Sequence, residues 1–116
     1  MIKKYTKITG NSAQILIPRQ KVANTTESGY TTSFNADSLS LMSLCNTHAT
    51  DSVDVDLFVY DAIKSTALAS ILHNTTIQAG ATLFLEGLEV SFDNNGDYDL
   101  RIQLSASDSA VDVIIK

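Results

Sequence analysis

The sequence lacks tryptophan, and it has one proline and one cysteine among its 116 residues. A lone cysteine, Cys45, cannot form an intramolecular disulfide, so the fold must depend on its hydrophobic core. A chain of this length is expected to form one domain that buries roughly two thirds of the surface of its unfolded chain. The apolar runs are only a few residues long, which excludes a membrane-spanning helix. No secretory leader is recognisable, so we expect no secretory signal.

Acidic residues are missing from the N-terminal part of the chain. None precedes Glu27, whereas residues 1–26 contain five of the eight basic residues: Lys3, Lys4, Lys7, Arg19 and Lys21. Residues 27–116 hold all thirteen acidic residues against three basic ones, which disfavours nucleic acid as a partner. The basic segment either docks on an acidic surface, including that of another copy, or is a solvated and partly frayed terminus.

Alternation of apolar and polar residues is the main pattern that is present. In Val53–Tyr60, Val53, Val55 and Leu57 alternate with Asp54 and Asp56, as a half-buried strand requires. Residues 66–73 could form a short helix, but their position between strands favours a strand. The pattern predicts seven or eight short strands, drawn from residues 4–9, 13–17, 39–45, 53–60, 66–73, 82–85, 88–92, 98–104 and 111–115.

These strands predict an all-β chain: a single antiparallel β-sandwich or jelly-roll-like domain with an N-terminal arm. We expect residues 38–116 to form the sandwich body, and residues 1–37 to form a basic arm and polar loop that contributes edge strands at most. The predicted core comprises Leu39, Leu41, Val53, Val55, Leu57, Val59, Leu83, Leu85, Leu100, Ile102, Leu104, Val111 and Val113.

Two acidic groups suggest chemistry at first sight. Residues 93–99 (DNNGDYD) begin like a calcium loop, but the sixth and twelfth positions hold Tyr98 and Leu104 where such a loop needs glycine and glutamate. A solvated hairpin turn is the preferred interpretation, and calcium on a loop of another type stays open. Asp51, Asp54, Asp56 and Asp61 are expected to form the polar side of an exposed strand.

Cysteine and histidine have no metal-ligand spacing here. Cys45, His48 and His73 form neither a CxxC nor an HxxxH pattern, so no zinc site is expected. A nucleophilic pair of Cys45 with either histidine is conceivable, although Cys45 fits better as a small core residue. We therefore predict no enzyme, no catalytic residue, no metal and no cofactor.

The order of segments from residue 38 to residue 115 resembles the small β-sandwich structural proteins of tailed-bacteriophage virions. The resemblance is carried by an apolar strand, an Asn-Thr turn, the VxVxLxVYD strand, a TxIxAGATLxL segment, an LxL strand and a short VxV strand. In this chain these segments are Leu39–Thr47, Val53–Asp61, Thr76–Leu85, Tyr98–Leu104 and Val111–Ile115.

The resemblance implies a role in assembly, located in the virion. Capsid decoration, as a cement protein, is the role that it implies first, and a collar, neck or tail component is the alternative. The partners would be other virion proteins, above all the major capsid protein and copies of this chain, with trimers suiting three-fold capsid positions. The residues that we expect to bind a partner are Lys3, Lys4, Lys7, Arg19, Lys21, Tyr30 and Phe34.

A glycan-binding adhesion module is the alternative from another class. Such modules stack sugars on exposed aromatic rings, and this chain offers only a few candidates, Tyr5, Tyr30, Tyr60 and Tyr98. Neither alternative involves nucleic acid or a membrane.

Overall fold

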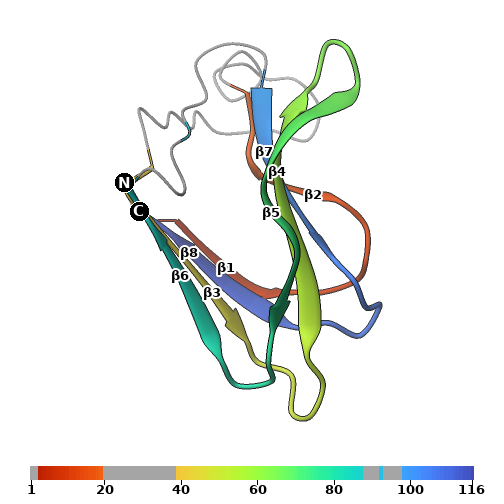
Figure 1. Cartoon of the computed structure of the whole chain (residues 1–116), viewed down its shortest axis with the longest axis vertical. Helices are drawn as coiled ribbons and strands as arrows, with labels where there is room; N and C mark the ends of the chain where they lie inside the picture. Colours follow the sequence, from red (N-terminus) through yellow and green to blue (C-terminus); the bar gives the residue numbers. More distant parts are fainter. Residues whose placement is uncertain (1–2, 20–38, 88–91, 93–97) are drawn as a thin grey trace.

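The computed structural model describes residues 3–19, 39–87, 92 and 98–116. Two antiparallel four-stranded sheets pack against each other, and the described part of the chain contains no α-helix (Figure 1). The strands are β1 (Lys3–Ile8), β2 (Gln14–Ile17), β3 (Leu41–Asn46), β4 (Val53–Asp61), β5 (Thr66–Ile77), β6 (Thr82–Glu86), β7 (Tyr98–Leu104) and β8 (Val111–Ile115). No helix in the described residues has the length and apolar character needed to cross a membrane.

The strand order is that of a jelly roll. One sheet has the order β1-β8-β3-β6 and the other has the order β2-β7-β4-β5. The chain therefore forms one long antiparallel ribbon that ends at the β4–β5 hairpin. Its successive strand pairs are β1–β8, β2–β7, β3–β6 and β4–β5. The ribbon is rolled so that the first and third pairs lie in one sheet and the second and fourth pairs lie in the other. This is the double-sheet arrangement of jelly-roll domains.

The core between the sheets is filled by hydrophobic side chains, most of them aliphatic. In β4, Val53, Val55 and Leu57 are buried, because the alternating sequence places them on the face toward the other sheet. The buried hydrophobic set is Ile8, Leu16, Ile17, Leu39, Met42, Leu44, Val53, Val55, Leu57, Ile77, Leu85, Phe92, Leu100, Ile102, Leu104, Val111, Val113 and Ile115. The prediction of an all-β sandwich or jelly roll is thus confirmed, and so is the strand at residues 66–73, which lies within β5. The strand expected at residues 88–92 lies outside the described residues except for its last position.

The structure corrects the predicted facing of β3. Met42 and Leu44 are fully buried, whereas Leu41 and Cys45 face outward and are half-buried. β3 lies between β8 and β6 in its sheet, and the residues on its outward face are half-buried, so both of its faces are partly covered. Apolar residues occupy both the odd-numbered and the even-numbered positions of β3, so the sequence did not show which face of the strand points into the core. The expectation that Leu41 and Cys45 belong to the core is wrong.

The N-terminal segment takes part in both sheets. β1 pairs with β8, with Lys3 opposite Ile115 and Lys4 opposite Ile114, and β1 is an edge strand of its sheet. β2 pairs with β7 and is an edge strand of the second sheet. The two strands cross between the sheets through a turn at Gly10, whose φ of 86° suits glycine.

Candidate functional site

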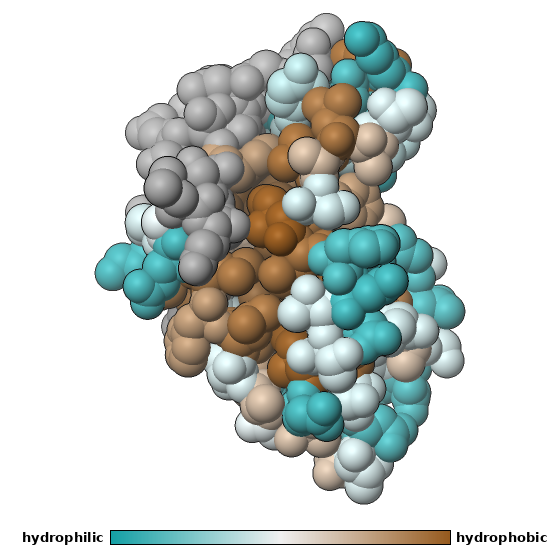
Figure 2. Space-filling model, in the orientation of Figure 1, coloured by the Kyte–Doolittle hydropathy of each residue, from teal (hydrophilic) through white to brown (hydrophobic). Residues whose placement is uncertain are grey.

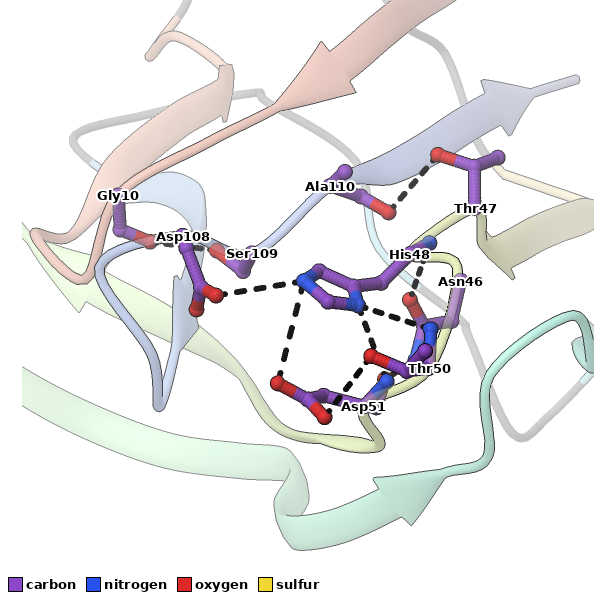
Figure 3. A network of polar contacts seen from close by, with 9 residues as sticks. All are labelled: Gly10, Asn46, Thr47, His48, Thr50, Asp51, Asp108, Ser109 and Ala110. Atoms are coloured by element: carbon purple, nitrogen blue, oxygen red, sulfur yellow. Dashed lines mark hydrogen bonds and ion pairs between the residues drawn. The ribbon is translucent and has the colours of Figure 1, made fainter.

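A network of polar contacts joins the loops at one end of the sandwich (Figure 3). His48 lies between β3 and β4, and Asp108 lies between β7 and β8. His48 Nε2 is 3.3 Å from Asp108 Oδ2 and 4.0 Å from Asp51 Oδ2. In the described part of the chain, these three residues form the one group of possible metal ligands that converges, with ligand atoms within 4.8 Å of one another.

The hydrogen bonds of His48 assign its protonation. Nδ1 accepts the backbone N–H of Thr50 (3.2 Å) and that of Asp51 (3.0 Å). A ring nitrogen that accepts hydrogen bonds carries no proton, so in the neutral ring the proton is on Nε2. Nε2–H then donates to Asp108 across the two loops.

This arrangement does not fit a metal ligand. A metal-bound histidine binds through one unprotonated nitrogen and donates the N–H of the other to a neighbouring acceptor. Here Nδ1 meets two donors, so Nε2 holds the proton and has no lone pair to offer. Asp51 and Asp108 are also largely solvent-exposed, at 67% and 66% of their side-chain surface. The cluster therefore has a structural role: its hydrogen bond between His48 and Asp108 connects the β7–β8 loop to the β3–β4 loop.

Asn46 is the buried centre of the same end of the molecule. Its side chain is fully buried, and Nδ2 donates to the carbonyl oxygens of Asp51 (3.0 Å) and Ile77 (2.9 Å). Its Oδ1 accepts the backbone N–H of His48 (3.0 Å). The backbone of Asn46 also bonds with Gly80 and Ala81, so this one residue organises the β3–β4 loop and the β5–β6 link. The sequence placed Asn46 in a solvated turn, and no local pattern distinguished it from the polar residues after it.

The acidic residues of β4 are held by local partners. Asp54 accepts the hydroxyl of Thr76 (2.6 Å). Asp56 accepts the backbone N–H of Asn74 (2.8 Å) and lies 3.1 Å from His73 Nδ1. Each of these contacts spans the β4–β5 pair, where Asn74 has a φ of 49° and the strand register shifts. The Asp54 and Asp56 carboxylates thus stabilise an irregular hairpin.

Asp61 differs from the other carboxylates because it is buried, at 6% exposure. Its Oδ1 accepts the N–H groups of Ile63 (3.0 Å) and Lys64 (3.1 Å), which shapes the β4–β5 turn. The expectation that Asp61 belongs to the polar side of an exposed strand is therefore wrong.

A second buried ionic group lies on the outer face of the β2-β7-β4-β5 sheet. Asp99 is 3% exposed and accepts the Arg19 backbone N–H (2.6 Å) and Arg101 Nη2 (3.0 Å). The Arg101 guanidinium lies 3.8 Å from the ring centroid of Tyr60, which β4 places beside it. The sequence placed Asp99 at the end of a solvated hairpin turn and on the polar side of the strand at residues 98–104. The expectation that its side chain is solvated is wrong, because Asp99 is buried. Its partner Arg19 is 80 residues away in sequence, so no local pattern indicated this contact.

Four of the seven residues expected to bind a partner are among the described residues, and three are not. Lys3, Lys4 and Lys7 belong to β1, and Arg19 is half-buried where β2 ends. Lys21, Tyr30 and Phe34 lie outside the described residues, as do residues 93–97 of the supposed calcium loop. Asp99, the last residue of that loop, already has both carboxylate oxygens engaged.

The conceivable nucleophilic pair of Cys45 with a histidine is not formed in the structure. Cys45 is half-buried on the outward side of β3, while both ring nitrogens of His48 contact loop atoms instead. His73 lies on β5 in the other sheet and faces Asp56. No nucleophile and base are therefore brought together among these three residues.

Comparison with known proteins gave no relatives: no family model matches the sequence, and no curated protein matches it.

Proposed function

We propose that this protein is a non-enzymatic structural protein of a tailed-bacteriophage virion that decorates the capsid as a cement protein. The observation that supports this most is the jelly-roll strand order, since viral capsid domains are one of the groups in which this fold recurs. The resemblance of residues 38–115 to small virion β-sandwich proteins points in the same direction. A collar, neck or tail position is the closest alternative within this class.

A fold alone does not fix a function, and jelly rolls also include lectins and cupins. An enzyme or small-molecule binder of this fold needs a cavity lined by a few convergent polar groups. In the described residues the space between the sheets holds hydrophobic side chains, and the side chain of the buried Asn46 is bonded to backbone atoms. These observations favour a role in packing against other proteins over one in chemistry.

A glycan-binding role has less support from the described aromatic residues. The exposed rings are Phe84 (60%) and Tyr98 (43%), and they lie in different sheets. Tyr60 is already stacked by Arg101. A sugar platform requires neighbouring rings with free faces. Phe58 and Tyr60 are neighbours in the described part of the chain, with ring centroids 6.5 Å apart, but both are half-buried and Arg101 covers the ring of Tyr60.

Co-sedimentation with capsids tests the proposal. Purified protein is mixed with empty capsids assembled from the major capsid protein encoded in the same genome, and the mixture is sedimented through sucrose. We expect saturable binding at a fixed ratio to capsid subunits. Binding to purified tails or necks, and not to capsids, would instead support a role as a collar, neck or tail component. Failure to bind any virion part, or specific binding on a glycan array, would overturn the proposal.

The capsid-binding segment is best tested by charge reversal. Deletion of residues 1–12 would remove β1 and expose the edge of β8, so lost binding would be ambiguous. Changing Lys3, Lys4 and Lys7 to glutamate keeps the length of the strand, and we expect reduced capsid occupancy in a protein that still unfolds cooperatively. Reversal of Lys64 alone, in the β4–β5 turn, is the control for a charge reversal outside β1.

A further inference from the structure

His48 faces different partners with its two ring nitrogens. Nδ1 accepts the backbone N–H groups of Thr50 (3.2 Å) and Asp51 (3.0 Å), so the side chain caps the β3–β4 loop. Nε2 faces carboxylate oxygens, at 3.3 Å from Asp108 Oδ2 and at 4.0 Å from Asp51 Oδ2. The His48 side chain is only 22% exposed, so these contacts replace most of the water around the ring.

The two kinds of partner suit different charge states of the ring. A neutral imidazole has one acceptor nitrogen and one N–H donor, whereas the charged ring has an N–H donor on each nitrogen and no acceptor. A protonated Nδ1 would direct its N–H at the N–H groups of Thr50 and Asp51, so the cap cannot survive protonation. The charged ring instead suits the carboxylates of Asp51 and Asp108, which accept charge-assisted hydrogen bonds.

Asp51 and Asp108 are the charged residues that face this histidine ring. In the described part of the chain, no other charged group lies within 4.0 Å of a ring nitrogen. The turn at Gly10 and the β5–β6 link, which adjoin this end of the molecule, contain no titratable side chain. On the adjoining strands, Asp54 of β4 bonds to β5, and Asp112 of β8 lies on the outer face of its sheet. The protonation of the ring itself therefore determines which arrangement forms.

The loop that His48 caps is open to water. The β3–β4 loop forms the lowest part of the ribbon in Figure 1, and mostly hydrophilic and neutral residues cover the same part of the surface in Figure 2. Thr50 and Asp51 are exposed, so water can hydrate their N–H groups once the ring no longer accepts them. The loop stays attached when this cap is lost, because the Asn46 side chain bonds to the His48 N–H and to the Asp51 carbonyl oxygen.

We propose that His48 is a pH-dependent switch that controls the β3–β4 loop. While the ring is neutral, Nδ1 caps the loop and Nε2–H donates to Asp108. When the ring takes up a proton at Nδ1, the N–H groups of Thr50 and Asp51 are released to water, and the ring turns so that both of its N–H groups meet carboxylates. Acid therefore loosens the β3–β4 loop, while the link to the β7–β8 loop is kept as an ion pair. The switch belongs to the isolated domain and does not depend on the proposed function.

NMR of the wild-type protein across a titration from about pH 8 to about pH 5 tests the switch. The chain has two histidines, His48 and His73, so one variant assigns the nitrogen signals of both rings. We expect the protection of the Thr50 and Asp51 amides against hydrogen exchange, corrected for the intrinsic effect of pH, to fall about tenfold as the His48 ring becomes charged. Equal protection with the neutral and the charged ring would overturn the inference, and so would a ring that stays neutral until the whole protein unfolds.

Two variants provide the controls. His48→Asn keeps an acceptor for the same N–H groups but has no charge to gain, so Thr50 and Asp51 should keep their protection over the whole titration. His73→Asn removes the other histidine, on β5 beside Asp56, and should leave the loss of protection unchanged. A loss of protection that persists in His48→Asn, or that disappears in His73→Asn, would assign the change to another group and refute the switch.

Discussion

The side-chain amide of Asn46 donates to the carbonyl oxygen of Ile77 at 2.9 Å, and this buried hydrogen bond connects the two sheets. Asn46 ends β3 in one sheet, and Ile77 ends β5 in the other. The contact is the centre of a group of polar interactions that fixes one end of the jelly roll. Stability at this end therefore depends on polar groups that must all be satisfied, because each is removed from water.

Changing Asn46 to aspartate should destabilise the protein strongly. The variant has almost the same shape, but it replaces an amide donor with an oxygen that faces the carbonyls of Asp51 and Ile77. We expect a loss of about 3 kcal/mol in the free energy of unfolding, measured by urea denaturation. Thr47→Ala removes one exposed hydrogen bond to Ala110 at the end of the same strand, and it should cost less than about 1 kcal/mol. Equal losses in the two variants would contradict the central role of Asn46.

His48 should be replaced more easily by asparagine than by alanine. An asparagine Oδ1 can take the place of Nδ1 and accept the N–H groups of Thr50 and Asp51, whereas alanine leaves both without that acceptor. We expect His48→Ala to cost about 1 kcal/mol and His48→Asn to cost clearly less. In the wild-type protein, nitrogen NMR should find the proton of the neutral ring on Nε2, and a Zn²⁺ titration should leave the ring resonances in place. Changes in the chemical shifts of the His48 ring on addition of Zn²⁺ would contradict the structural role of His48.

Substitutions at Asp61 should separate its hydrogen bonds from its charge. Asp61→Asn keeps the Oδ1 acceptor for Ile63 and Lys64, whereas Asp61→Ala removes it from the β4–β5 turn. We expect the alanine variant to lose about 1–2 kcal/mol and the asparagine variant to lose less than half of that. Thermal unfolding of the two variants at equal pH would measure the difference. Losses of the same size would show that the carboxylate charge matters more than the turn.

The ion pair of Asp99 and Arg101 should behave as a coupled unit. Their side chains are 5% and 22% exposed, so Arg101→Met leaves a buried carboxylate without its cation. We expect this variant to lose about 3 kcal/mol, including the contact with Tyr60. The double variant with Asp99→Asn should be more stable than the sum of the two single losses predicts. A double-mutant cycle measures this coupling, and strict additivity would refute it.

The sequence was informative where one face of a strand is apolar and the other is polar. Val53, Val55 and Leu57 are buried as their alternation predicts, and the all-β class follows from several such segments. It was ambiguous at Met42 and Leu44, because β3 is central and both of its faces are partly covered. Periodicity specifies which residues share a face, but it does not specify which of two similar faces is inside.

The polar centres could not be predicted, because their partners are distant in sequence. Asn46 bonds to Ile77, Asp99 to Arg19, and His48 to Asp108, so each interaction depends on the complete rolled topology. In the sequence these residues belong to ordinary polar turns or strand ends. Hydrogen bonds between segments that are distant in sequence leave no local pattern, whereas a hydrophobic strand does.

The rolled ribbon also determines how the protein must fold. The β4–β5 pair is local in sequence, whereas the β1–β8 pair joins residues from the two ends of the chain, such as Lys3 and Ile115. Closing a longer loop costs more entropy, so we expect the β4–β5 hairpin to form early and the terminal pair to form late. Folding should then take milliseconds to seconds, as in other domains dominated by distant strand pairs.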